Sequence, residues 1–226
     1  MLSSGLSQGS VPKLQRPGPL REQVYEALLE LIITRSLTPG QHLVETELAG
    51  HLGVSRQPVR EALQRLNTEG WVDLRPAQGA FVHEPTDEEA DQLLVVRALL
   101  ETEAARLAAA NATSKGLERL EELCEAGEAA VTADDVDAVV AANAALHTCV
   151  MELAGNAVLA ELARQVERRV RWYYTPVARQ RGMQSWVEHR ELIAAIAERD
   201  GERAQQVMRV HTEHTRTSYH QRSHED

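Results

Sequence analysis

Three histidines and one asparagine stand on apolar faces of predicted helices, where polar side chains are uncommon. Asn143 and His147 lie one turn apart on one such face, and His189 and His211 lie on the apolar faces of two later helices. A single histidine in this setting is usually a core residue with a hydrogen-bond partner. Three neutral imidazoles from three helices of one bundle can instead converge on a divalent metal ion and leave coordination positions open for water or a ligand.

A second candidate site lies in the sequence GVSRQPVREALQRL, at residues 53–66. On a helical wheel its apolar face consists of Val59, Ala62, Leu63 and Leu66. The adjacent face carries only side chains that form hydrogen bonds: Arg56, Gln57, Arg60, Gln64 and Asn67. Arginine binds guanine or phosphate, and glutamine pairs with adenine. A solvated amphipathic helix would show the same face, so the flanking elements have to decide between the two interpretations.

The elements around this stretch are those of a winged helix-turn-helix. Helical patterns at about 20–32 and 45–52 precede it; Gly53 supplies a turn and Ser55 an N-cap for a third helix at about 56–68. Two β-prone runs, WVDLR and AFVH, follow and are joined by PAQG, which predicts a hairpin with Gly79 at its tip. This order favours a DNA recognition helix over a merely solvated one.

No strand pattern appears after His83-Glu84-Pro85. Thr86 and Glu89 form a capping box, and six helices are predicted at about 86–111, 114–131, 134–154, 157–180, 184–199 and 201–220. We therefore expect a mainly α protein. Its predicted parts are a flexible arm at 1–17, a winged helix-turn-helix domain at 18–84 and an all-α bundle at 85–226.

Composition and charge narrow the class of protein. The net charge is −10, but residues 1–84 carry 8 basic and 9 acidic side chains, whereas residues 85–226 carry 16 and 25. The acidic total argues against nonspecific wrapping of nucleic acid and allows a local basic face on the first part. No run reaches the length of a membrane span, and the two cysteines form no metal-type spacing. We expect a cytoplasmic protein without a membrane partner.

The first part resembles the DNA-binding domain of the GntR family of bacterial transcription regulators. The resemblance runs from Leu20 to Val82 and rests on LTPGQHL (37–43), ELAGHLGVSRQPVREALQRL (47–66) and EGWVDLRPAQGAFV (69–82). This long, ordered motif implies that Ser55, Arg56 and Arg60 contact operator DNA and that the wing at Gly79 reaches the minor groove.

The second part resembles the FCD effector domain of the FadR-type branch, in its shorter VanR-like variant. The matching segments are VRALLETEAARLAA (96–109), NAALHTCVMELAGN (143–156), EHRELIAAIAERDGERA (188–204) and MRVH (208–211). The resemblance implies that Asn143, His147, His189 and His211 bind a divalent metal ion, for which we expect zinc or nickel.

Arg97 is the candidate for effector binding. It lies at the edge of an apolar stripe, and two interpretations carry equal weight: an ion pair with Glu101 one turn later, or a guanidinium that holds a carboxylate effector, as the resemblance implies. Arg169 and Tyr173, one turn apart on a later helix, are predicted to line the same cavity.

The leading hypothesis is a sequence-specific regulator, a repressor, that is controlled by a small organic acid and not an enzyme. We expect a homodimer on a two-fold symmetric operator, since one recognition helix covers only a few base pairs. A hydrolytic metalloenzyme using the three histidines is the alternative. A DNA-binding or scaffolding protein whose second part only dimerises is the third possibility.

Overall fold

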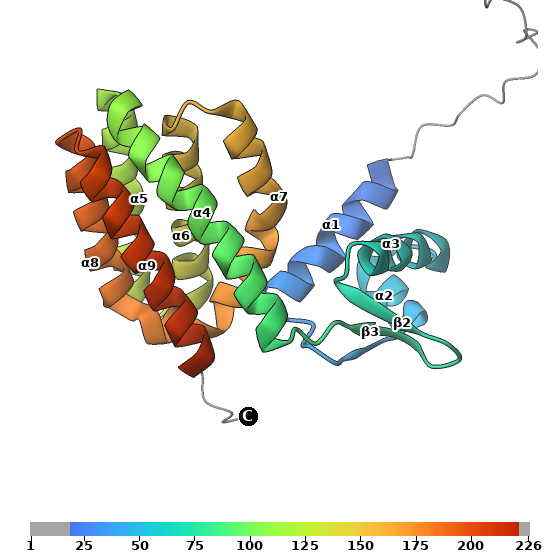
Figure 1. Cartoon of the computed structure of the whole chain (residues 1–226). Coiled ribbons are helices and arrows are strands. Elements are labelled where there is room, and N and C mark those ends of the chain that lie inside the picture. Colours follow the sequence, from blue (N-terminus) through green and yellow to red (C-terminus); the bar gives the residue numbers. More distant parts are fainter. Residues whose placement is uncertain (1–18, 222–226) are drawn as a thin grey trace, which may run out of the picture. The chain divides into compact units, whose positions relative to one another are not determined.

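The computed structural model describes residues 19–221, which form two compact units; the predicted arm at 1–17 lies outside these residues (Figure 1). Of the described residues, unit 1 comprises 19–30 together with Gly40–His83, and unit 2 comprises Leu31–Pro39 and 84–221. The fold is mainly α, as predicted, with a small antiparallel sheet confined to unit 1.

Unit 1 contains helix α1 (Pro19–Ile33) as far as Glu30, helices α2 (Glu45–Leu52) and α3 (Arg56–Thr68), and strands β1 (His42–Leu43), β2 (Val72–Arg75) and β3 (Gly79–Val82). The strand order is β1-β3-β2, with Leu43 opposite Ala80 and Val72 opposite Val82. The sequence analysis did not predict β1, because two residues are too few to show an alternating pattern.

The turn between α2 and α3 forms as the sequence indicates. Gly53 has the left-handed φ of 66° that ends α2, and Pro58 occupies the third position of α3, where no intrahelical hydrogen bond is lost. Ser55 holds the N-cap position, but its side chain makes no capping hydrogen bond. The predicted apolar face of α3 is buried in the core of unit 1.

The hairpin turn differs from the prediction in one detail. Residues 76–78 form the turn, and Gly79 begins β3 opposite Arg75, so Gly79 lies at the base of the turn and not at its tip. Its φ is 104°, and a Cβ there would lie 2.8 Å from Nε2 of His42. The positive φ favours glycine at this position, and any other residue would also have to displace the end of the His42 side chain.

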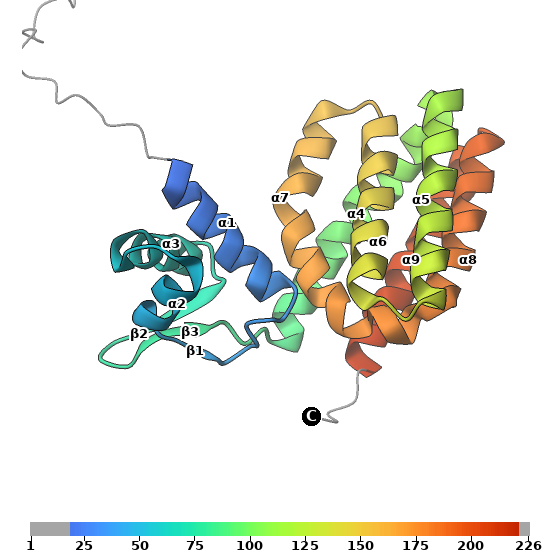
Figure 2. The same ribbon diagram turned by 180° about the vertical axis from the view of Figure 1, so that it is seen from behind.

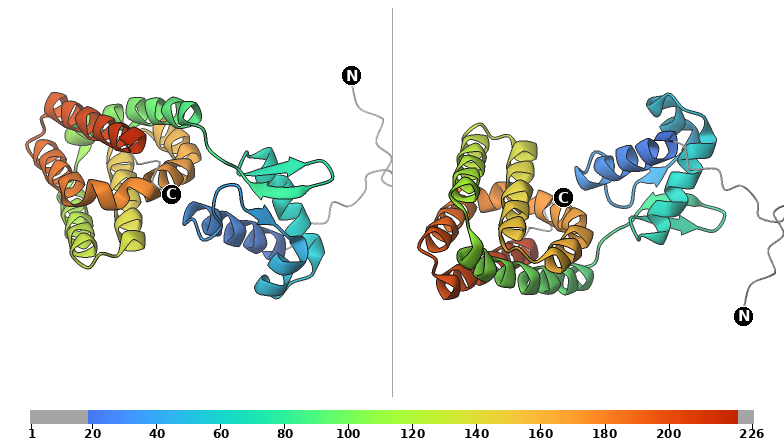
Figure 3. Two further views of the ribbon diagram at one scale, coloured as in Figure 1. Left: turned by 90° about the horizontal axis from the view of Figure 1, so that it is seen from below. Right: turned by 90° about the horizontal axis from the view of Figure 1, so that it is seen from above.

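Unit 2 is a bundle of six helices, α4 (Asp87–Asn111), α5 (Ser114–Thr132), α6 (Val136–Leu153), α7 (Ala157–Tyr174), α8 (Ala178–Ala197) and α9 (Gly201–Gln221). Viewed from either end in Figure 3, they surround a common interior, and Figure 2 shows α6 between α5 and α7. Side-chain caps fix several starts: Thr86 and Glu89 form the predicted capping box, and Asp135 and Asn156 cap α6 and α7.

The predicted helix at 157–180 is too long. It ends at Tyr174, and the 3₁₀ turn Thr175–Val177 contains Pro176, which cannot continue the hydrogen-bond ladder. Helix α8 then begins at Ala178 and bends at Gly182, whose φ is 43°. Among the helices of residues 19–221, α6 alone is long and apolar enough to cross a membrane. The core helices of other proteins often meet the same criterion, so it is weak evidence for a membrane span.

Candidate functional site

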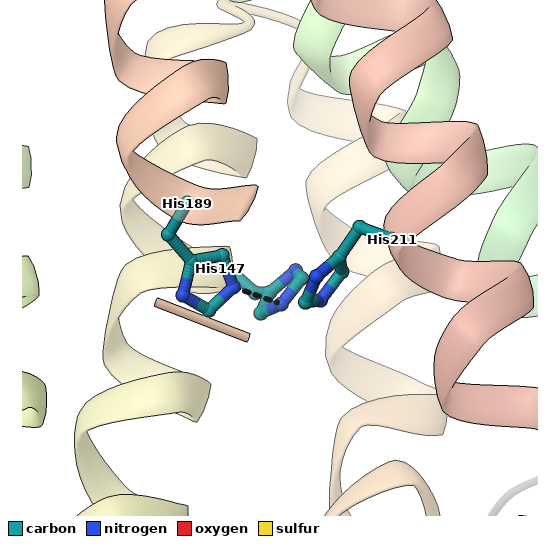
Figure 4. A group of neighbouring side chains, drawn as sticks. All are labelled: His147, His189 and His211. Atoms are coloured by element: carbon teal, nitrogen blue, oxygen red, sulfur yellow. Dashed lines mark hydrogen bonds between the residues drawn. The ribbon is translucent and has the colours of Figure 1, made fainter. Parts of the chain in front are cut away.

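The three predicted histidines meet in the interior of unit 2. His147 comes from α6, His189 from α8 and His211 from α9, and Figure 4 shows their rings pointing toward one another. One nitrogen from each ring lies within 4.8 Å of the others, and Nε2 of His147 is 3.4 Å from Nε2 of His189. All three side chains are buried, so the convergence expected from three apolar faces is present.

One buried carboxylate is hydrogen-bonded to a ring of the cluster, and a second lies beside another ring. Nδ1 of His211 donates to Oε2 of Glu188 at 2.8 Å, and Nδ1 of His147 lies 3.2 Å from Oε2 of Glu101. A proton on Nδ1 of His211 leaves its Nε2 lone pair free, which is how carboxylates orient metal-binding histidines. Sequence reasoning missed Glu188, although its position beside His189 and seven residues after Arg181 was a usable signal.

Two imidazoles of the cluster, those of His189 and His211, favour the neutral form, and several polar atoms around the cluster have no hydrogen-bond partner within residues 19–221. Burial lowers the pKa of His189 and of His211 well below the ordinary value, and the neighbouring histidines lower it further. Among the described residues no partner reaches Nδ1 of His189, Nε2 of His211 or Oδ1 of Asn143. Unpaired buried polar atoms are costly unless a further group binds them.

Arg97 forms the ion pair with Glu101 that was one of its two interpretations, and it also contacts the cluster. Its Nε donates to Oε1 of Glu101 at 2.9 Å, and its Nη2 lies 3.2 Å from Nε2 of His147. Burial raises the pKa of Glu101, but Arg97 and His147 outweigh this effect and lower it to about 2. Nη1 of Arg97 is buried and has no hydrogen-bond partner within residues 19–221.

A cavity of about 260 Å³ opens beside the cluster, between α4, α6 and α7. Arg97, Glu101, Asn143 and His147 line its polar side. Much of the remaining wall is apolar: Leu100, Ala144, Met151, Ala163, Val166 and Val170. The cavity therefore has the size and lining of a site for a small molecule with an acidic head and an apolar body.

The two predicted effector contacts on α7 lie elsewhere. Tyr173 packs edge-on against Tyr219, with ring centroids 5.4 Å apart, and neither Tyr173 nor Arg169 lines the cavity. Arg171 and Tyr174 line it instead. A helix turns about 100° per residue, so a shift of one or two positions moves a side chain to another face. The sequence did not fix which face of α7 would turn toward α4 and α6.

The polar face of α3 is exposed, and three of its side chains form hydrogen bonds with acidic residues of the same unit. Nε and Nη2 of Arg60 donate to the two carboxylate oxygens of Glu45, each at 2.8 Å, and Nη2 of Arg56 donates to Oε2 of the same residue at 3.0 Å. Gln57 donates to Glu61 at 2.8 Å. The structure thus brings Arg56 and Arg60 together through an acidic residue of α2 that the sequence analysis did not single out.

A groove of about 590 Å³ runs between α3 and the hairpin. Arg56, Arg60 and Gln64 line one side, and Arg75 and Gly79 line the other. The guanidinium of Arg75 lies over the ring of Phe81, 4.2 Å from its centroid. Arg75 places a cation at the hairpin, and sequence reasoning missed it because the side chain belongs to a strand and not to the turn.

Comparison with known proteins gives consistent matches along the chain. The pattern of bacterial regulatory proteins of the gntR family matches residues 20–82, and that of the FCD domain matches residues 92–214. YdhC of Bacillus subtilis, an uncharacterised helix-turn-helix transcriptional regulator, is 28% identical over 89% of this chain and 92% of its own length. The Escherichia coli regulator McbR is 31% identical over 64% of this chain and 65% of its own.

Solved structures agree with the sequence comparisons. The structure of McbR from E. coli superposes with a TM-score of 0.78 at 25% identity, covering 91% of this chain and 99% of McbR. A GntR-type regulator from Rhodococcus superposes with a TM-score of 0.75, also at 25% identity, covering 89% and 97%.

Proposed function

This chain belongs to the GntR family of bacterial regulatory proteins and carries an FCD domain. On that premise we propose that it is a repressor whose affinity for its operator is controlled by a small organic-acid effector bound near a divalent metal ion. It is a DNA-binding transcription regulator with a buried three-histidine cluster in its effector domain. We assign DNA recognition to residues 18–84 and effector binding and dimerisation to 85–226. Its relatives are transcription regulators, so the metalloenzyme alternative is set aside.

For DNA recognition we propose Ser55, Arg56, Gln57, Arg60 and Gln64 on α3, with Gly79 at the hairpin. The exposed arginines and the groove between α3 and the hairpin support this assignment. Arg75, at the rim of the same groove, is an additional candidate for a phosphate contact. The operator lies in the cytoplasm, where we expect the protein to act.

The residues of the cluster fit a divalent metal ion. His147, His189 and His211 would hold it, with the oxygen of Asn143 as a fourth donor. The close approach of one nitrogen from each ring, the unpartnered Nε2 of His211 and Oδ1 of Asn143, and the carboxylate of Glu188 on Nδ1 of His211 support this proposal. Imidazole donors suit zinc and nickel. When bound, such an ion acts as a Lewis acid that attracts an oxygen of a carboxylate.

The unpartnered Nη1 of Arg97 is the observation that carries the effector proposal. Arg97 is buried at the cavity wall, and its Nε donates a hydrogen bond to Glu101. Its Nη1 has no acceptor among residues 19–221. A carboxylate supplies that acceptor, and the apolar wall would cover an aliphatic or aromatic body. When the Nε2 lone pair of His147 binds a metal, Nη2 of Arg97 also becomes available to the carboxylate.

We also propose a homodimer on a two-fold symmetric operator, within the shorter VanR-like variant of the branch, which the six-helix bundle supports. Val95, Val96 and Leu99 form an apolar patch on α4, and the side chain of Leu99 is 67% exposed. Such a patch on a regulator that needs two recognition helices supports self-association.

The test combines elemental analysis with DNA titration on the full chain. The double variant His189→Ala, His211→Ala is compared with wild type and with His51→Ala, whose ring is exposed on α2. We expect stoichiometric metal in wild type and in His51→Ala, loss of metal in the double variant, and retained DNA binding in all three. Stoichiometric metal in the double variant contradicts the proposed site. Wild type that selects no preferred duplex from a randomised pool contradicts the regulator function.

A further inference from the structure

Glu45 of α2 binds the two arginines on the polar face of α3, Arg56 and Arg60, and we call this carboxylate the hub of that face. It is the first residue of α2, and its two oxygens accept three hydrogen bonds from two arginines that lie 11 and 15 residues later in the chain. The contact with Arg60 is bidentate, the geometry in which a guanidinium and a carboxylate fix each other's orientation.

The hydrogen bond from Arg60 lowers the pKa of Glu45 to about 2, since desolvation only partly opposes it and Arg56 adds to it. The side chain is therefore a carboxylate at neutral pH. Its charge cancels one of the two positive charges of Arg56 and Arg60. A phosphate backbone approaching this face meets a net charge of one cation instead of two.

Helix capping does not account for the arrangement. An acidic residue in the first turn of a helix interacts favourably with the helix dipole, and Glu47 in the same turn meets that need as well. The dipole does not require a side chain to reach across to α3 and to bind two guanidinium groups.

The bidentate contact also decides which part of Arg60 is available. Glu45 uses Nε and Nη2, so Nη1 is the group of Arg60 that makes no hydrogen bond to any residue that the structure describes. Glu45 and Arg60 both line the groove between α3 and the hairpin. The free edge of the guanidinium is thus held in one orientation beside the surface that faces a ligand.

We propose that Glu45 is a specificity-determining positioning residue, which holds Arg60 and Arg56 in a base-reading orientation and limits their attraction to DNA of any sequence. The inference rests on the proposed role of α3 in DNA recognition. An oriented arginine distinguishes guanine from other bases, whereas a freely moving one binds phosphates wherever it finds them. Removing the carboxylate should therefore strengthen random binding and weaken the preference for the operator.

Glu61 provides a matched control. Its side chain is 26% exposed, the same as that of Glu45, and it lies on α3 in the same unit. It pairs with Arg21 at 2.6 Å and accepts from Gln57, and it forms no hydrogen bond or ion pair with Arg56 or Arg60. Glu61→Gln removes the same charge, keeps an amide oxygen that can accept from Gln57, and leaves the contacts of Glu45 with Arg56 and Arg60 unchanged.

The experiment uses the full chain and two duplexes of equal length: one enriched by wild type from a randomised pool, and a scrambled version of it. For Glu45→Gln we expect the ratio of the two affinities to fall about tenfold, which corresponds to one oriented base contact. We expect the salt dependence of binding to the scrambled duplex to steepen by about one ion. Glu61→Gln should change both affinities by the same factor and leave the ratio as in wild type.

A second comparison tests whether Glu45 acts through Arg60. In an Arg60→Ala background, Glu45→Gln should lower the ratio much less than it does in wild type, because the oriented group is gone. A tenfold fall in that background overturns the proposal, as does a ratio that Glu45→Gln and Glu61→Gln leave equally unchanged. Circular dichroism checks that each variant is folded, and Glu45→Ser replaces Glu45→Gln if the latter unfolds. A pool that yields no preferred duplex overturns the function of α3 itself.

Discussion

Glu45 in unit 1 and Glu188 in unit 2 have the same task in opposite surroundings. Glu45 binds two arginines with a side chain that is 26% exposed. Glu188 binds Arg181, His211 and His214 with a side chain that is 7% exposed, and the contacts to the two histidines measure 2.8 and 2.7 Å.

The contrast shows what burial adds to an ion pair. Exposed pairs contribute little to stability, because water solvates the separated partners almost as well. Arg56 and Arg60 can therefore exchange the carboxylate of Glu45 for a DNA phosphate at a small cost in free energy. A buried carboxylate cannot be removed without leaving buried cations unpaired, so Glu188 holds its partners in one arrangement. Unit 1 thus presents an exchangeable charged surface, and unit 2 presents a rigid polar interior.

The largest effect on stability is expected when the buried carboxylate of Glu188, the buried hub of unit 2, is removed. Glu188→Gln leaves the buried guanidinium of Arg181 without its carboxylate, and we expect a loss of about 3–5 kcal/mol in the free energy of unfolding. Urea unfolding followed by circular dichroism measures it. Glu45→Gln is the exposed counterpart and should leave the urea midpoint close to that of wild type. Equal losses in the two variants would remove the distinction between the units.

An intermediate effect is expected on DNA binding. Arg60→Ala removes an exposed base-reading side chain, and we expect affinity for the selected duplex to fall about 5- to 150-fold with little change in stability. Fluorescence anisotropy measures the affinity. Arg65→Ala is the control on the same helix, since Arg65 pairs with Glu22 and Glu69 instead of Glu45. An unchanged affinity for Arg60→Ala would mean that the exposed surface of unit 1 does not read DNA.

The smallest effect should come from an ion pair on the outside of the bundle. Hydrogen bonds from Arg216 and then His220 lower the pKa of Asp91 from its ordinary 3.8 to about 2. The carboxylate form is thus favoured by folding, so its contribution is complete above about pH 4 and is lost as the pH falls toward 2.

Asp91→Asn should therefore cause a small destabilisation at pH 6 that shrinks at pH 3.5, as measured by urea unfolding against wild type. Asp134→Asn, whose pair with Arg179 is more exposed, is the control and should be nearly neutral at both values. A deficit for Asp91→Asn that grows on acidification would mean that this pair behaves like the buried hub.

Local patterns in the sequence determined the elements and their faces. The apolar period of α3, the capping box at Thr86 and the apolar faces that hold His147, His189 and His211 all depend on residues within a few turns of one another, so they are legible without a fold. The prediction that three histidines meet in one interior follows from those faces, because a bundle has a single core.

The tertiary structure alone decided which side chains met. Glu45 reaches Arg60 across 15 residues and Glu188 reaches His211 across 23, and no periodic signal connects such pairs. The choice of Arg171 and Tyr174 over Arg169 and Tyr173 depended on how α7 rotates against its neighbours, where one residue changes the face by about 100°. Sequence periodicity identifies the side of a helix that is buried, whereas the partners on that side are set by packing between elements far apart in the chain.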